Sequence, residues 1–116
     1  MRITTWNINS VRLRIGLALK LLDQSRPDVL CLQETKCPDE QFPFEAFRDI
    51  GYKYIAVNGM KAYNGVALIS RVPFESELAL DWTERSDCRH ISGVFPGDIE
   101  IHNFYVPAGG DEPDIE

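Results

Sequence analysis

Two polar residues that end apolar stretches are the side chains best suited to chemistry in this sequence. Glu34 follows Gln33 after the apolar run 29–32, and Asn7 closes the β-rich run that starts at Arg2. Carboxylate and amide oxygens suit Mg²⁺ or Mn²⁺ and not zinc, and Mg²⁺ normally keeps several waters and leaves positions for substrate phosphate. Together the two residues would support metal-assisted phosphoester chemistry. Taken singly, a Glu at a strand end is usually solvated and an Asn there usually forms a turn.

A β-α-β unit would bring these two residues together. The hydrophobic pattern predicts a strand over 2–8, a helix over 10–25 and a strand over 28–34. Strands joined by such a crossover are parallel and share a carboxyl edge, which is where ligands bind in sheets of this type. Neighbouring strands lie about 4.8 Å apart. If these two strands are neighbours, Asn7 and Glu34 face one small volume.

Local signals define the remaining elements. Ser10 is predicted to cap the crossover helix, and Pro27 is predicted to stop it. The buried face of this helix repeats at the helical rhythm, at Val11, Ile15, Ala18 and Leu22. Downstream, the sequence predicts a short helix over 43–50 that ends at Gly51, followed by strands over 52–57, 65–70, 74–80, 89–95 and 99–106. Tyr105 is then a third polar residue at a strand terminus. Trp6 and Trp82 are predicted to lie in the core.

Composition is typical of one small soluble domain. The chain has 116 residues, of which 44% are hydrophobic, enough for one domain with a real core but not for two. It contains neither a run of about 20 apolar residues that could span a membrane nor a secretory signal pattern at its start, so a cytoplasmic location without membrane contact is expected. Three cysteines without a Cys-x-x-Cys pair argue against a disulfide framework and against a zinc ribbon.

The charge is unevenly distributed along the chain. A formal net charge of −6 argues at face value against a nucleic-acid partner. Residues 1–36, however, carry six Lys and Arg against three acids, whereas residues 37–116 carry six against fifteen. A local basic rim can contact phosphates while the remaining surface is acidic. Acidity therefore does not exclude DNA binding.

Four segments of the sequence resemble exonuclease III-like AP endonucleases and occur in the same order. They are Trp6-Asn7-Ile8-Asn9-Ser10-Val11-Arg12, Leu32-Gln33-Glu34-Thr35-Lys36, Tyr63-Asn64-Gly65-Val66-Ala67-Leu68 and Asn103-Phe104-Tyr105-Val106-Pro107. The Leu-Gln-Glu core is shared by the wider endonuclease/exonuclease/phosphatase superfamily, and the extension to Gln-Glu-Thr-Lys resembles its DNA-repair branch. The resemblance runs from residue 2 to about residue 110.

The resemblance implies a four-layer α/β sandwich (DNase I-like) built from two mixed sheets, of which residues 1–116 would form about the first half. It implies hydrolysis of the phosphodiester 5′ to an abasic site and 3′→5′ removal of nucleotides from double-stranded DNA by a monomeric enzyme that uses Mg²⁺ (alternatively Mn²⁺). Carried over by position, Glu34 would be the principal metal ligand, Asn7 would belong to the metal site, and Tyr105 would be the catalytic tyrosine beside the scissile phosphate. The residues expected to contact DNA are Arg12, Lys36, Tyr63, Asn64 and Arg89.

Each of these roles has an ordinary structural alternative. Arg12 and Lys36 could be solvated surface charges, and Tyr63 could be a packing aromatic. Arg89 could pair with nearby acids, and Tyr105 could be a core aromatic whose hydroxyl finds a partner.

Two features depart from the family pattern. Ala108 stands where an Asn or Gln often follows Tyr-Val-Pro. The later family motifs, Asp-x-Asn and Asp-His, which activate and orient the attacking water, do not occur in these 116 residues. Because base catalysis contributes about 10²–10⁴-fold, the 116-residue chain alone is expected to be inactive. His90 and His102 lack motif support and are interpreted as structural or surface residues.

Two other interpretations remain open. The chain could be another superfamily phosphoesterase, such as an RNA-directed nuclease or an inositol-phosphate phosphatase. It could also be an inactive fragment that binds DNA or a protein partner weakly. The sequence does not set the balance between endonuclease and exonuclease activity, the choice of Mg²⁺ over Mn²⁺, or whether the native chain continues past Glu116.

Overall fold

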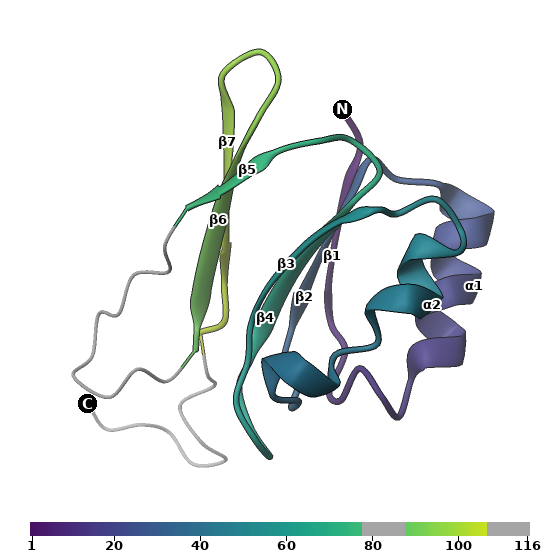
Figure 1. The fold of residues 1–116 in the computed structure, drawn as a ribbon, viewed down its shortest axis with the longest axis vertical. Helices are drawn as coiled ribbons and strands as arrows, with labels where there is room; N and C mark the ends of the chain where they lie inside the picture. Colours follow the sequence, from purple (N-terminus) through teal and green to yellow (C-terminus); the bar gives the residue numbers. More distant parts are fainter. Residues whose placement is uncertain (78–87, 107–116) are drawn as a thin grey trace, which may run out of the picture.

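Two β-sheets and a pair of helices make three layers in the computed structural model, which describes residues 1–77 and 88–106 (Figure 1). Sheet A contains four strands in the order β1-β2-β4-β3, namely β1 (Ile3–Asn7), β2 (Val29–Gln33), β4 (Val66–Ser70) and β3 (Tyr54–Asn58). Sheet B contains β5 (Glu75–Glu77), β6 (His90–Phe95) and β7 (Ile99–Phe104), in that order. On the face of sheet A that is turned away from sheet B lie α1 (Ile15–Ser25) and α2 (Phe44–Arg48), and a 3₁₀ turn spans Asp39–Gln41.

The predicted β-α-β unit is confirmed. Strands β1 and β2 are parallel neighbours in sheet A, and their register pairs Asn7 with Gln33, the residue before Glu34. Strand β4 pairs antiparallel with both β2 and β3. Strand β7 lies against β2 and β4, while β6 lies against β4 and β3. The carboxyl ends of β1 and β2 are thereby brought to one edge of sheet A.

Two apolar cores hold the three layers together. One fills the space between the helices and sheet A and includes Leu22, Leu30 and Phe47, with Trp6 packed against it. The other lies between the sheets and includes Cys31 and Leu68. Strand β2 is buried on both faces, which is why its sequence is a continuous apolar run.

The prediction that Ser10 caps the crossover helix is wrong. Helix α1 begins at Ile15, and its N-cap, Arg14, makes no side-chain capping hydrogen bond. The reason is the backbone conformation of Ser10, whose φ of 88° lies outside the extended region that N-cap residues adopt. The loop after β2 holds this conformation, because the N–H of Ser10 donates to the carbonyl of Glu34 at 2.8 Å. Its hydroxyl accepts a 3.3 Å hydrogen bond from the N–H of Leu13 within the turn before the helix. The segment that leaves β1 is therefore tied to the loop after β2, and the helix starts one turn later.

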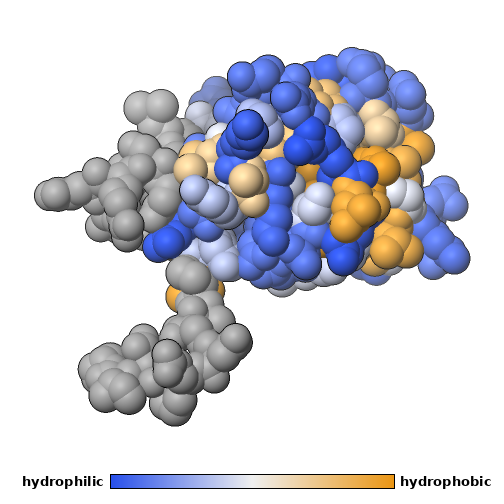
Figure 2. Space-filling view, turned by 90° about the horizontal axis from the view of Figure 1, so that it is seen from below, coloured by the Kyte–Doolittle hydropathy of each residue, from blue (hydrophilic) through white to orange (hydrophobic). Residues whose placement is uncertain are grey.

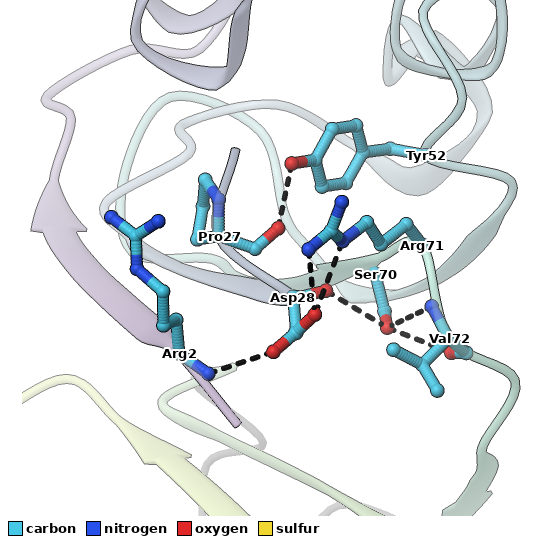
Figure 3. A network of polar contacts seen from close by, with 7 residues as sticks. All are labelled: Arg2, Pro27, Asp28, Tyr52, Ser70, Arg71 and Val72. Carbon is cyan, nitrogen blue, oxygen red and sulfur yellow. Dashed lines mark hydrogen bonds and ion pairs between the residues drawn. The ribbon is translucent and has the colours of Figure 1, made fainter. Parts of the chain in front are cut away.

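A polar network joins the strands at the end of sheet A opposite to Glu34 (Figure 3). The Asp28 carboxylate accepts the backbone N–H of Arg2 at 2.7 Å and two hydrogen bonds from Arg71, at 2.9 and 3.1 Å. These hydrogen bonds, first that of the Arg2 backbone and then those of Arg71, lower the pKa of Asp28. The Tyr52 hydroxyl donates to the carbonyl of Pro27 at 2.6 Å. This network fixes where β1, β2 and β4 begin or end, and so sets their register.

Most other boundaries agree with the sequence prediction. The turn between β6 and β7 lies at 96–98, and α1 ends before Pro27. Strand β5 covers the start of the predicted strand 74–80, whose last residues lie outside the described part of the chain, as do Trp82 and Ala108. Cys31 and Cys37 are buried free thiols. No helix among residues 1–77 and 88–106 is both long and apolar enough to cross a membrane.

Candidate functional site

The two residues singled out as metal ligands lie in contact. Asn7 is the last residue of β1, and Glu34 directly follows β2. The Asn7 Nδ2 donates to Glu34 Oε2 at 3.1 Å. The parallel pairing of their strands produces this contact, because it brings two carboxyl ends to the same edge.

Tyr105 joins them from the other sheet. It lies one residue beyond β7, and its backbone N–H donates to the carbonyl of Arg89 at 2.8 Å, which continues the pairing of β7 with the chain before β6. Its hydroxyl donates to the carboxylate of Glu34. The site therefore spans both sheets, with an amide and a carboxylate from sheet A and a phenol from sheet B.

These contacts favour a negatively charged Glu34. The hydrogen bond from Tyr105, followed by that from Asn7 and the nearby charge of Lys36, lowers the pKa of Glu34, since each favours the ionised carboxylate. The same hydrogen bond, together with partial burial, raises the pKa of Tyr105. At neutral pH the site therefore holds a carboxylate beside a protonated phenol.

Lys36 contributes a positive charge to the site. Its Nζ lies 3.7 Å from Glu34 Oε1 and donates to Asn9 Oδ1 at 2.6 Å. Asn9 belongs to the first of the four family-like segments but had no predicted role, and the Asn-x-Asn spacing was the available signal. With residues i and i+2 on an extended chain facing the same way, Asn7 and Asn9 were candidates for a common site.

A chain of backbone hydrogen bonds connects the loops under the site. The N–H of Thr35 donates to the carbonyl of Gly65 at 3.1 Å, that of Lys36 to Asn64 at 2.9 Å, and that of Gly65 to Cys88 at 3.1 Å. Positive φ angles recur along these loops, at 52° for Asn9, 88° for Ser10, 57° for Glu34, 54° for Lys36, 58° for Asn64 and 57° for Cys88. Non-glycine residues rarely adopt this conformation, and such residues gather at functional sites.

The other residues expected to contact DNA differ in their exposure and in how they contact the site. Arg12 is exposed and donates to the side chain of Gln41. Tyr63 is 61% exposed, so it is not the packing aromatic that the alternative interpretation allowed. Asn64 touches the site through its backbone carbonyl, and Arg89 through its pairing with Tyr105.

Glu34 and Asn7 offer some of the oxygen ligands that a hard divalent cation needs. Glu34 is anionic, is partly exposed, and lies beside the amide of Asn7. Mg²⁺ is commonly bound through one or two carboxylates and several waters. Within the part of the chain that the structure describes, no group of three or more His, Cys, Asp or Glu residues could hold a metal ion. The carboxylate of Glu34 and the amide of Asn7 offer oxygen donors of the kind that hard divalent cations prefer.

The His pair lies apart from these residues. His90 is buried, and its Nε2 lies 2.9 Å from Nδ1 of His102, whose Nε2 lies 3.0 Å from Oε1 of Glu100. Burial and the neighbouring His102 lower the pKa of His90. These contacts agree with the structural role predicted for the two histidines.

Fold and site define an α/β protein of two packed sheets with a hard-oxygen site at the sheet edge. The chain belongs to the Endonuclease/Exonuclease/phosphatase family, whose sequence model matches residues 4–114. It is 37% identical to exodeoxyribonuclease III of Haemophilus influenzae over 93% of this chain and 46% of that protein.

Solved structures of DNA repair nucleases share the fold. An AP endonuclease from Archaeoglobus fulgidus is 38% identical, with a TM-score of 0.83 over 92% of this chain and 41% of that one. A 3′ phosphatase from Neisseria bound to a product DNA hairpin is 34% identical, with a TM-score of 0.87 over 98% of this chain and 45% of that one. The predicted fold class and the resemblance to exonuclease III are therefore confirmed. The chain spans less than half the length of each of these three relatives.

Proposed function

We propose that this chain forms the amino-terminal half of a Mg²⁺-dependent DNA repair nuclease that cleaves the phosphodiester 5′ to abasic sites and removes nucleotides 3′→5′. The observation that carries the proposal is the convergence of Glu34, Asn7 and Tyr105, from two sheets, at one edge of the sandwich. Its relatives include an exodeoxyribonuclease III and an AP endonuclease, and one neighbour is bound to DNA. Double-stranded DNA with abasic sites or 3′ ends is the proposed substrate of a monomeric enzyme.

The residues have distinct roles in this proposal. Glu34 and Asn7 would hold Mg²⁺, which supplies stabilisation of the negative charge that develops on phosphoryl oxygens. Tyr105 would orient the phosphate, because its hydroxyl is a protonated donor beside the carboxylate. Lys36 would attract the DNA backbone, since its ammonium lies at the rim of the same site. Arg12, Tyr63, Asn64 and Arg89 are proposed as further DNA contacts around this rim.

The edges of the two sheets support a longer domain. Among the described residues, β1 and β7 each pair with one neighbouring strand only. Because β7 lies over β2 and β4, β1 and β7 border the same side of the sandwich, and the other two edge strands, β3 and β5, border the opposite side. Beside β1, a hollow of about 450 Å³ is lined by Trp6 and Leu21 and by Leu17, which is 58% exposed. Figure 2 shows apolar side chains gathered on the side of the molecule where the helices lie. We propose that the second half of the family domain covers the side bordered by β1 and β7.

A chimaeric enzyme tests the proposed function. This chain would replace the matched amino-terminal part of the Haemophilus influenzae exodeoxyribonuclease III, and incision of an end-labelled duplex with one abasic site would be measured in Mg²⁺. We expect incision that EDTA abolishes and that Glu34→Ala reduces more than about 100-fold at saturating substrate, as for loss of a group that stabilises transition-state charge. Glu45→Ala is the matched control, because Glu45 is an exposed carboxylate on α2 that pairs with Arg48.

Two outcomes would contradict the proposal. A folded Glu34→Ala chimaera with normal turnover would refute the metal role. A chimaera that hydrolyses single-stranded RNA or inositol phosphates in preference to abasic duplex would favour another phosphoesterase of the superfamily.

A further inference from the structure

The side chain of Asn103 crosses the space between the two sheets. It is 3% exposed and lies on β7. Its Nδ2 donates to the carbonyl of Leu32 at 3.0 Å and to that of Ala67 at 2.8 Å, and its Oδ1 accepts from Nε2 of Gln33 at 2.8 Å. Both protons and the oxygen of one amide are therefore used on groups of sheet A.

The surroundings make this amide unusual. The space between the sheets is otherwise an apolar core that includes Cys31, Leu68 and Ile101. A buried amide without partners is costly, and here every polar group of the amide is bonded. Apolar packing resists separation of the sheets but allows small sliding, whereas three directed hydrogen bonds fix one register.

The position of the amide relates it to the site. Asn103 lies two residues before Tyr105, and its partner Leu32 lies two residues before Glu34. Side chains two apart on an extended chain face the same way, so Tyr105, like Asn103, points toward sheet A. The amide therefore joins β7 to β2 two residues behind the place where the hydroxyl of Tyr105 meets the carboxylate of Glu34. A shift of one sheet against the other would change both contacts together.

We infer that Asn103 is a positioning residue, whose three inter-sheet hydrogen bonds set the distance between the hydroxyl of Tyr105 and the carboxylate of Glu34. The catalytic meaning of that distance rests on the proposed function, but the positioning itself does not. Gln33 acts with Asn103, because its donated hydrogen bond orients the amide so that Nδ2 faces the two carbonyls. Gln33 is held in turn by Thr5, whose Oγ1 accepts from the same Nε2 at 2.9 Å.

The test measures the contact at the site without activity. The resonance of the Tyr105 ring carbon that bears the hydroxyl is recorded at neutral pH in the 116-residue chain labelled with ¹³C-tyrosine, and Glu34→Ala gives its position when the hydrogen bond is lost. We expect Asn103→Leu, which keeps the volume and removes the amide, to move this resonance to the Glu34→Ala position. Ile101→Ala is the matched control, because Ile101 is buried in the same core two residues earlier on β7. It loosens packing without touching the amide and should leave the resonance in place.

Two results would overturn the inference. One is a folded Asn103→Leu chain whose Tyr105 resonance is unchanged. The other is an equal displacement in Ile101→Ala, which would assign the effect to packing in general. If Asn103→Leu does not fold, the Tyr105 resonance is measured in Gln33→Met instead. It keeps the side-chain length and removes the donor, so a displacement in the same direction supports the inference, and an unchanged resonance refutes it.

The proposed function is tested separately in the parent chain labelled uniformly with ¹³C and ¹⁵N. Added Mn²⁺ should broaden the signals of Asn7 and Glu34, because a paramagnetic ion relaxes nearby nuclei. Failure of Mn²⁺ to do so would refute the metal site. The metal-free Tyr105 resonance would still decide the role of Asn103.

Discussion

Gly65 is the position at which one added methyl group should disturb the site most. A Cβ there would lie 2.2 Å from Oγ1 of Thr35, and the backbone of Gly65 has a φ of +94°. The left-handed conformation costs an L-residue about 1–2 kcal/mol and overpacking of a buried contact about 1–3 kcal/mol, so Gly65→Ala should lower the free energy of unfolding by about 2–5 kcal/mol. Small domains are stable by only about 5–15 kcal/mol, so this is a large fraction.

Urea denaturation followed by circular dichroism measures the loss. The matched control is Gly16→Ala in α1, where an added Cβ meets nothing within 4 Å. Because glycine is unfavourable in a helix, this second substitution should stabilise the protein by about 0.5–1 kcal/mol. The same chemical change is thus expected to have opposite signs at two places.

A double-mutant cycle separates the two components of the Gly65 effect. Thr35→Ala removes the close oxygen and leaves Lys36 N at 3.4 Å and the Thr35 Cβ at 3.5 Å as the nearest atoms to the new methyl group. In the Thr35→Ala background, Gly65→Ala should therefore cost only the conformational part, about 1–2 kcal/mol. Additivity of the two substitutions within about 0.5 kcal/mol would refute the steric explanation, since contacting residues are expected to couple more strongly than that.

Four further predictions concern other parts of the structure. Asp28→Asn should lower the urea midpoint at neutral pH, and the difference should disappear in acid. This sign follows because a carboxyl whose pKa is lowered in the folded state stabilises the protein above its unfolded pKa and loses that effect as the pH falls through its folded pKa. Phe47→Ala should reduce the free energy of unfolding by about 3–5 kcal/mol, because Phe47 is fully buried, and the same urea titration measures it. Tyr105→Phe should raise the pKa of Glu34 toward that of an ordinary carboxyl in a ¹³C NMR titration, since the main hydrogen bond that lowers it is lost. Cys31, whose thiol pKa is raised to about 11 by burial, should react with a thiol reagent far more slowly in the native protein than in urea, and equal rates would contradict its burial.

The first part of sheet A and its crossover helix could be predicted from the local sequence pattern. The apolar run of β2, the helical repeat of α1 and the stop at Pro27 predict a parallel β-α-β unit, and that unit alone brings Asn7 to Glu34. Tyr105 could be placed at a strand end by its neighbours. That it reaches Glu34 required the packing of one sheet on the other, which the resemblance to a family implied and local pattern did not.

What the sequence did not reveal depends on contacts between distant segments. The start of α1 was misplaced because Ser10 has a positive φ, and that conformation is held by a hydrogen bond from its N–H to the carbonyl of Glu34, 24 positions away. The role of Asn103 was missed for the same reason, since its partner Leu32 is separated from it by 71 positions. Local propensity describes a segment as if its hydrogen bonds stayed within it. The hydrogen bonds of Ser10 and Asn103 instead reach distant segments.

The recurrence of left-handed residues at the site follows from the same long-range contacts. Glu34, Lys36 and Asn64 each hold a positive φ that costs a non-glycine residue about 1–2 kcal/mol. Backbone hydrogen bonds that cross from loop to loop, such as those that Gly65 gives and receives, oppose relaxation of these angles. With Glu34 in an extended conformation, its side chain would follow the strand alternation, and its direction relative to Asn7 would change. The strained backbone is therefore what aims the carboxylate, and the close approach of Thr35 to Gly65, which only a residue without a Cβ permits, is what holds the strain in place.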